Sequence, residues 1–132
     1  IDKQLTEGRP EHPRITYIEA ITHERPARDA VDAIVGENPN CVVILGSRGA
    51  SAKMSGEYSV YEDLVPKGSY VIMEDTIVGG HPVWGNFGVG PYEAVKGITE
   101  TRGDFVSDAS FDKYGLTFNP TGYLRRIKPR PE

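Results

Sequence analysis

Two short and wholly apolar runs constrain the fold of this chain more than any other feature of its sequence. They are Cys41–Leu45 and Tyr70–Met73, and each ends abruptly at glycine or charged residues. Neither run alternates between apolar and polar residues, which is typical of a strand covered on both faces, as in a parallel sheet. Both are far shorter than the roughly 20 apolar residues of a membrane-spanning helix. The two runs therefore predict buried parallel strands and no membrane span.

Apolar residues recur at helical spacing around the two runs. One helix is predicted between Pro26, which suits the first turn, and Gly36, which can end it. A second begins with Ser51 as its N-cap, and a third opens at Pro91 with Glu93 in its positive first turn. The inward-facing residues are predicted to be Ala27, Ala30, Val31 and Ile34 in the first helix, Met54, Tyr58, Tyr61 and Val65 in the second, and Ala94, Val95 and Ile98 in the third.

Three further segments are predicted to be extended. Arg14–Ile18 is β-branched and aromatic and reads as a short strand. Leu116–Asn119 and Tyr123–Arg126 flank a Pro-Thr-Gly turn, which favours a terminal antiparallel hairpin. Strands that alternate with helices are typical of helices packed on a mostly parallel sheet. The sequence therefore predicts an α/β fold within a single domain over residues 1–132.

Composition excludes several classes of function. The chain has 15 Lys and Arg against 19 Asp and Glu, a net charge of −4, and its basic residues are scattered, which argues against a nucleic-acid surface. One basic cluster within 125–130 is interpreted as a solvated tail. The single cysteine, Cys41, excludes an intrachain disulfide and a Cys-based zinc cluster. We therefore expect a reducing, cytoplasmic location.

Candidate functional residues follow the predicted strands. Ligands of open α/β sheets bind beyond the carboxyl ends of the strands. Here those positions are Glu19, the turn over residues 46–49, and the adjacent carboxylates Glu74 and Asp75. The acidic pair could hold a hard cation such as Mg²⁺, and an exposed polar strand end explains it equally well. The 46–49 turn could cradle a polar ligand, but it lacks the spacing of a nucleotide triphosphate loop.

A glycine-rich loop over residues 76–90 follows the acidic pair. Long loops in compact domains are usually functional or disordered. The loop contains His81, whose neutral imidazole can serve as a general base near pH 7, with an ordinary surface or packing role as the alternative. Trp84, Phe87 and Tyr92 would suit an apolar wall for a substrate, and packing of the loop explains them equally well.

Motifs that are recognisable in combination extend over nearly the whole chain. They are 71–76 (VIMEDT), 80–83 (GHPV), 87–95 (FGVGPYEAV) and 114–126 (YGLTFNPTGYLRR), with 14–19 and 64–70 upstream. Together they resemble the cephalosporin hydroxylase and rhamnosyl O-methyltransferase family. The resemblance implies a Rossmann-like class I methyltransferase, with a mostly parallel sheet, helices on both faces and a terminal hairpin. It also implies S-adenosylmethionine as methyl donor, a sugar or natural-product hydroxyl as acceptor, and commonly Mg²⁺. Hydroxylation is the less favoured alternative.

The resemblance assigns the cofactor side of the site. Ile1 and Asp2 resemble the end of the family's second strand, whose acid binds the ribose hydroxyls of the cofactor. Glu19 and Ala20 follow the third strand, where the adenine would lie. Ser47, in the turn after the fourth strand, completes the predicted cofactor-binding residues.

The resemblance also assigns the reacting side. Glu74 and Asp75 match the family's acidic pair and would bind a metal, with Asp75 also positioning the acceptor hydroxyl. His81 matches the Gly-His-Pro element and is the candidate catalytic base. One departure concerns the metal, because Gly46 stands where the family commonly has an acid. Arg48 lies nearby, and its positive charge would repel a cation if it turned inward.

A second departure concerns the whole domain. The family's first strand and glycine-rich loop would lie before Ile1, so we expect this chain to be the carboxyl-terminal portion of a longer methyltransferase. Its expected partner is a small-molecule, saccharide or glycolipid acceptor, without nucleic acid, and a homo-oligomer stays open. The alternative function is a catalytically silent fragment or binding module of the same fold.

Overall fold

The computed structural model describes residues 1–46, 50–112 and 115–130. These residues form two compact units, Ile1–Asn38 and Pro39–Glu132, which are described separately below. Among the residues that the structure describes, none of the helices has the length and apolar character needed to cross a membrane.

The first unit contains one helix, α1 (Arg25–Val35), which confirms the helix predicted after Pro26. Gly36 ends it with a φ of 70° and donates its N–H to the carbonyl of Asp32 at 3.0 Å. The strand predicted over Arg14–Ile18 does not form in this unit, where a single parallel bridge joins Asp2 to Glu19. A strand needs a neighbour along its length to pair its backbone groups, and one bridge does not supply it.

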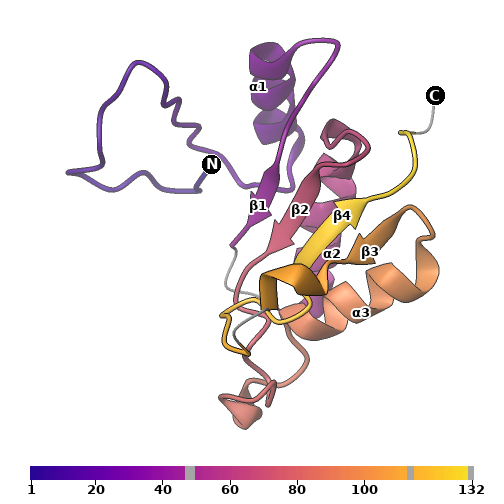
Figure 1. Ribbon diagram of the computed structural model, residues 1–132. Coiled ribbons are helices and arrows are strands. Elements are labelled where there is room, and N and C mark those ends of the chain that lie inside the picture. The colour runs from indigo at the N-terminus through magenta and orange to yellow at the C-terminus, as the bar shows by residue number, and fades with distance from the viewer. Residues whose placement is uncertain (47–49, 113–114, 131–132) are drawn as a thin grey trace. The chain divides into compact units, whose positions relative to one another are not determined.

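The second unit contains a mixed four-stranded sheet. Its strands are β1 (Val43–Leu45), β2 (Tyr70–Met73), β3 (Phe105–Ser107) and β4 (Tyr123–Arg126), in the order β1-β2-β4-β3. β1 and β2 are parallel, which confirms the pairing predicted for the two apolar runs. β4 lies between β2 and β3 and runs antiparallel to both (Figure 1). The last strand of the chain therefore enters the sheet between two earlier ones.

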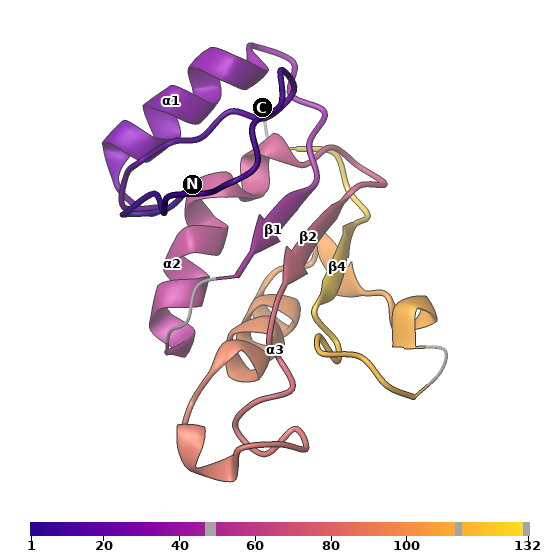
Figure 2. The same cartoon turned by 90° about the vertical axis from the view of Figure 1, so that its left-hand side faces the viewer.

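Two helices of this unit pack against each other and against the sheet. They are α2 (Ser51–Tyr61), which contacts β1 and continues into the short 3-10 helix Glu62–Leu64, and α3 (Pro91–Thr101), which contacts β3. Figure 2 shows α3 continuing from the long loop that leaves the carboxyl end of β2. The buried apolar residues of the sheet and helices are Leu45, Met54, Tyr58, Tyr61, Leu64, Val65, Val71, Met73, Ala94, Val95, Ile98, Phe105 and Leu124. This core confirms the inward faces predicted for both helices.

The prediction that β1 is covered on both faces is wrong. Leu45 is buried, but Ile44 is 60% exposed, so the two neighbours on the strand differ sharply. Successive side chains of a strand point to opposite faces, and α2 and α3 pack together on one of them. Among the described strands one pair is parallel and two pairs are antiparallel, so this part of the sheet is mixed, and the mostly parallel sheet with helices on both faces is not confirmed.

The predicted terminal hairpin has a different partner. β4 pairs with Phe105–Ser107 and not with Leu116–Asn119. Phe105 is buried against the edge of the Tyr58 ring, with centroids 5.6 Å apart, whereas Leu116 is 87% exposed. The pairing with Phe105–Ser107 is favoured because it buries an aromatic ring, and burial of apolar area is the main favourable contribution to the free energy of folding.

The N-cap of α2 is also different from the prediction. The cap is Ala50, with no side-chain hydrogen bond, and Ser51 is the first helical residue. The Ser51 N–H instead donates to the carbonyl of Val89 at 3.3 Å, at the end of the glycine-rich loop. α3 begins as predicted, with Pro91 in its first turn, and the Glu93 carboxylate accepts the N–H of the N-cap residue Gly90 at 2.7 Å.

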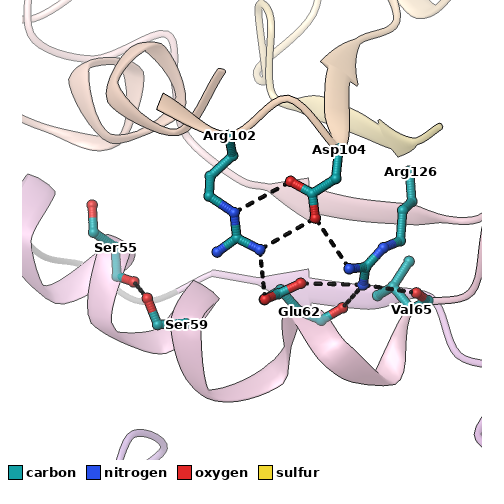
Figure 3. A network of polar contacts seen from close by, with 7 residues as sticks. All are labelled: Ser55, Ser59, Glu62, Val65, Arg102, Asp104 and Arg126. Atoms are coloured by element: carbon teal, nitrogen blue, oxygen red, sulfur yellow. Dashed lines mark hydrogen bonds and ion pairs between the residues drawn. The ribbon is translucent and has the colours of Figure 1, made fainter. Parts of the chain in front are cut away.

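A buried cation corrects the interpretation of the basic tail. The Arg126 side chain is 0% exposed and donates to the carbonyls of Glu62 (2.8 Å) and Val65 (3.2 Å) and to Asp104 Oδ2 (3.1 Å). Arg126 also pairs with Glu62 Oε2 at 3.1 Å. Arg102 binds the carboxylates of both Glu62 and Asp104, at 2.8 and 3.2 Å (Figure 3). A charge this deeply buried is stable only when paired and hydrogen-bonded. Arg126 is thus a structural residue that connects β4 to two neighbouring elements.

Candidate functional site

The carboxyl ends of β1 and β2 bring Gly46 and Glu74 together. Leu45 pairs with Met73, and the Glu74 N–H donates to the carbonyl of Leu45 at 2.9 Å. The Glu74 carboxylate lies so close to Gly46 that a Cβ added there would overlap its Oε2. The absence of a side chain at position 46 is therefore what allows Glu74 to lie across the end of β1.

Asp75 is held in an uncommon backbone conformation by a distant residue. Its φ is 57°, in the left-handed region, and its N–H donates to Asn119 Oδ1 at 2.9 Å. The neighbouring Thr76 is fully buried and donates its hydroxyl to the carbonyl of Pro120 at 2.6 Å. Thr117 in turn accepts the Asn119 N–H at 3.1 Å. The segment over 117–120 thus clamps the turn that presents Asp75.

Sequence reasoning did not identify Asn119 as part of the site. It lies inside the 114–126 motif, beside the Pro-Thr-Gly turn, but 44 residues from Asp75 in the chain. An asparagine beside such a turn indicates a local hydrogen bond and gives no sign of a distant acceptor role. The only sign in the sequence that Asn119 belongs to the site was therefore its place in the 114–126 motif.

His81 is held by a carboxylate and an aromatic ring. Its Nε2 lies 2.7 Å from Glu93 Oε1, and its ring stacks on Tyr92 with centroids 3.7 Å apart and planes 15° apart. The other Glu93 oxygen accepts the Gly90 N–H at 2.7 Å. The imidazole remains 29% exposed, so a ligand could reach it. Two predicted residues, His81 and Tyr92, therefore lie in direct contact. Glu93, which was predicted only as a first-turn residue of the helix, also binds His81.

The ionisation of Glu93 follows from these contacts. Partial burial acts to raise the pKa of Glu93, but the hydrogen bonds from the Gly90 N–H and from His81 outweigh it and lower the pKa below its ordinary value. Glu93 is consequently a carboxylate at neutral pH.

The other two aromatic residues of the loop pair with each other. Trp84 is 66% exposed and meets the Phe87 ring edge-on, with centroids 5.2 Å apart. Trp84 is therefore available to a ligand, and its place as part of an acceptor wall stays a prediction.

The predicted metal ligands do not assemble into a complete site. Among residues 1–46, 50–112 and 115–130, no group of three His, Cys, Asp or Glu side chains is arranged to hold a metal ion. Gly46 contributes no ligand, and Ser47 and Arg48 lie outside the described residues. Magnesium at Glu74 and Asp75 stays a prediction, and no step below passes through it. Isothermal titration with Mg²⁺ tests it, since the heat should vanish in the Glu74→Gln and Asp75→Asn variants.

The predicted cofactor residues of the first unit lie side by side. The Asp2 N–H donates to the carbonyl of Ile18 at 3.0 Å, and the Ala20 N–H donates to the carbonyl of Asp2 at 2.9 Å. The bridge pairs Asp2 directly with Glu19, and both residues are exposed. Exposed carboxylates are acceptors that suit ribose hydroxyls, so these residues fit the predicted role.

The parallel pair of β1 and β2 with its packed helices defines an α/β protein, in which carboxylates follow β2 and an imidazole lies on the loop after them. The particular family follows from comparison with known proteins. The family model described as Rhamnosyl O-methyltransferase/CmcI matches residues 1–127, and the chain belongs to this family.

Individual relatives agree with the family. The chain is similar to the rhamnosyl O-methyltransferase of Mycobacterium leprae (strain TN), with 32% identity over 117 residues, 86% of this chain and 51% of the relative. It is 30% identical to the rhamnosyl O-methyltransferases of Mycobacterium bovis (strain BCG / Pasteur 1173P2) and Mycobacterium tuberculosis (strain ATCC 25618 / H37Rv), over 86% of this chain and 48% of each relative. The chain thus spans about half the length of these curated relatives. No solved structure matches it significantly.

Proposed function

We propose that the protein to which this chain belongs is an O-methyltransferase that uses S-adenosylmethionine and acts on a hydroxyl of a sugar or of a glycosylated lipid or natural product. The observation that carries the proposal is the family match over residues 1–127. The relatives are named rhamnosyl O-methyltransferases, so a rhamnosyl group is the first acceptor to test. The proposal includes the class I methyltransferase fold, to which the parallel pair of β1 and β2 would contribute.

The cofactor-binding residues implied by the family resemblance include the exposed carboxylates of the first unit. Asp2 would accept hydrogen bonds from the ribose hydroxyls, and Glu19 and Ala20 would border the adenine. Ser47 belongs to the same proposal but lies outside the described residues. S-adenosylmethionine supplies an activated methyl group when bound.

The acceptor side uses Asp75 and His81. Asp75 is presented by a clamped turn, so its carboxylate can hold the acceptor hydroxyl in one orientation. His81 takes the hydroxyl proton while the oxygen forms its bond to the methyl carbon. The electron pair of the broken carbon–sulfur bond stays on sulfur, which becomes a neutral thioether. Positioned proton transfer of this kind typically contributes about 10²- to 10⁴-fold to the rate.

The test is methyl transfer by the full native protein from S-adenosylmethionine with a tritiated methyl group to methyl α-L-rhamnopyranoside. We expect a labelled product that gains one methyl group, and a fall in kcat of about 10²-fold or more in the His81→Asn variant. The control is His23→Asn, an exposed histidine of the first unit, which should leave kcat unchanged. Transfer that is unaffected by His81→Asn would remove the assigned base.

A non-catalytic role is the second candidate, and one observation favours it. The Glu74 carboxylate fills the space that a side chain at position 46 would occupy, which is where the family resemblance implies an acid. Equilibrium dialysis with S-adenosylmethionine separates the two candidates, because a silent relative need not retain affinity for the methyl donor. Retained affinity for S-adenosylmethionine would remove the non-catalytic role, and loss of that affinity would support it.

A further inference from the structure

Glu93 contacts the loop before it with both carboxylate oxygens. Oε2 accepts the Gly90 N–H at 2.7 Å, and Oε1 lies 2.7 Å from His81 Nε2. The start of the helix needs only the first of these contacts, because that contact already satisfies the backbone N–H of the N-cap residue Gly90. The second contact therefore serves His81 and not the helix.

Two contacts together determine the orientation of the His81 ring. Stacking on Tyr92, with the ring planes 15° apart, sets the plane of the imidazole. The bond from Nε2 to Glu93 sets its rotation within that plane. A ring fixed in both respects presents its remaining nitrogen, Nδ1, in one direction. Among the residues that the structure describes, no group is hydrogen-bonded to this nitrogen.

We propose that Glu93 is the positioning residue of the site, which keeps the His81 proton on Nε2 and so makes Nδ1 the atom that takes the acceptor proton. The inference rests on the proposed function and specifies which nitrogen of His81 accepts the proton. An ionised carboxylate only accepts hydrogen bonds, so the nitrogen facing Glu93 must be the donor. The second nitrogen of a neutral imidazole then carries the lone pair.

The proton balance of the step is complete with these groups. The acceptor hydroxyl gives its proton to Nδ1, and His81 becomes an imidazolium beside the Glu93 carboxylate. The oxygen bonds to the methyl carbon of S-adenosylmethionine, and the electron pair of the carbon–sulfur bond stays on sulfur. Glu93 accepts no proton in this step and acts only by orienting and stabilising the imidazolium.

The decisive variant is Glu93→Gln. The amide oxygen of glutamine can accept the Gly90 N–H in place of the carboxylate, so the start of α3 should be kept. Its amide can donate as well as accept, so the preference for the proton on Nε2 should be lost. A purely structural role of Glu93 would leave this variant unchanged. The control is Glu100→Gln on the same helix, where the side chain is exposed and pairs loosely with Lys96 at 3.9 Å.

The experiment reads the tautomer and the rate separately in the full native protein. Long-range ¹⁵N–¹H NMR of histidine-labelled protein should show His81 with its proton on Nε2. In Glu93→Gln the amide oxygen keeps the Gly90 N–H and the amide NH₂ faces Nε2, so the His81 proton should shift toward Nδ1. With S-adenosylmethionine and methyl α-L-rhamnopyranoside, kcat should fall about 10- to 100-fold in Glu93→Gln with little change in KM, by analogy with the carboxylates that orient metal-ligating histidines. Glu100→Gln should match the parent protein in both measurements.

Two results would overturn the inference. One is a His81 proton on Nδ1 in the parent protein, and the other is a Glu93→Gln variant with unchanged tautomer and kcat. If the parent protein transfers no methyl group, the proposed function fails, and the NMR result still decides whether Glu93 sets the tautomer. The failure of the inference and the failure of the function are thus distinguishable.

Discussion

Two charged clusters of the second unit use similar chemistry in opposite surroundings. Arg126 is fully buried and is bound by two carbonyls and two carboxylates, of Glu62 and Asp104. His81 is partly exposed and is bound by a single carboxylate, that of Glu93, with one ring nitrogen left over. Arg126 holds the fold together, and because it is fully buried, even its Nε, which has no hydrogen-bond partner among the described residues, is out of reach of a ligand. His81, by contrast, is partly exposed and has a ring nitrogen without a hydrogen-bond partner in the described part of the chain, which can bind a ligand or accept a proton.

The largest expected effect on stability comes from breaking the buried cluster. Arg126→Ala leaves the carboxylates of Glu62 and Asp104 without their buried partner, and breaking such a pair typically costs about 3 to 5 kcal/mol. Urea denaturation measures the free energy of unfolding. Arg125→Ala is the control, because that side chain is about half exposed and its loss should change stability by less than about 0.5 kcal/mol. Equal effects of the two variants would contradict the comparison.

The next effect concerns the turn that presents Asp75. Asn119→Ala removes the acceptor of the Asp75 N–H and leaves a left-handed residue without its support, which should cost about 1 to 2 kcal/mol. The proposed methyl transfer should fall as well, because Asp75 loses its orientation. Asn86→Ala, in the exposed part of the loop, should change neither quantity. Lower stability with full activity would separate the clamp from the proposed site.

A smaller effect on stability should appear at acidic pH, and it concerns Glu93, the partner of His81. The pKa of Glu93 is lower in the folded protein than its ordinary value of about 4.3, so its contribution to stability is present above that value. It is lost as the pH falls through the folded pKa. The melting temperature of Glu93→Gln should therefore depend less on pH between about pH 5 and pH 2 than that of the parent protein. An identical pH dependence would contradict the lowered pKa.

The smallest effect sharpens the description of the buried cluster itself. Tyr58 is buried beside it, and burial raises the pKa of its hydroxyl above the ordinary value. Within the part of the chain that the structure describes, this hydroxyl has no hydrogen-bond partner. Removing an unsatisfied buried hydroxyl relieves its desolvation cost, so Tyr58→Phe should be neutral or slightly stabilising in urea denaturation. A loss of more than about 1 kcal/mol would reveal a partner for the hydroxyl.

Features that depend on neighbours in the sequence were predicted well. The helices around residues 26–35, 51–61 and 91–101 follow from apolar residues at helical spacing, and β1 and β2 follow from continuous apolar runs. The first turn of α3 follows from Pro91 and Glu93. These elements reflect local conformational preferences, and the same elements are present in the folded structure.

Features that depend on distant partners were not. The choice of Phe105–Ser107 over Leu116–Asn119 as partner of β4, and the burial of Arg126 within a basic stretch, were both predicted differently. Nothing in the local pattern of 125–130 distinguishes a buried arginine from exposed ones. The distinction arises because Arg126 faces carbonyls more than 60 residues earlier in the chain, at separations of 64 and 61.

The sequence by itself determined the alternation of strands and helices, the acidic residues at the strand ends, and the motifs that identify the family. Only the tertiary structure decided which residues support them: Asn119 behind Asp75, Glu93 behind His81, and Glu74 across Gly46. The physical reason is that periodicity and turn chemistry act over a few residues, whereas hydrogen bonds and ion pairs form between whichever groups the packed core brings within about 3 Å. The candidate residues could thus be read from the chain, and their partners only from the fold.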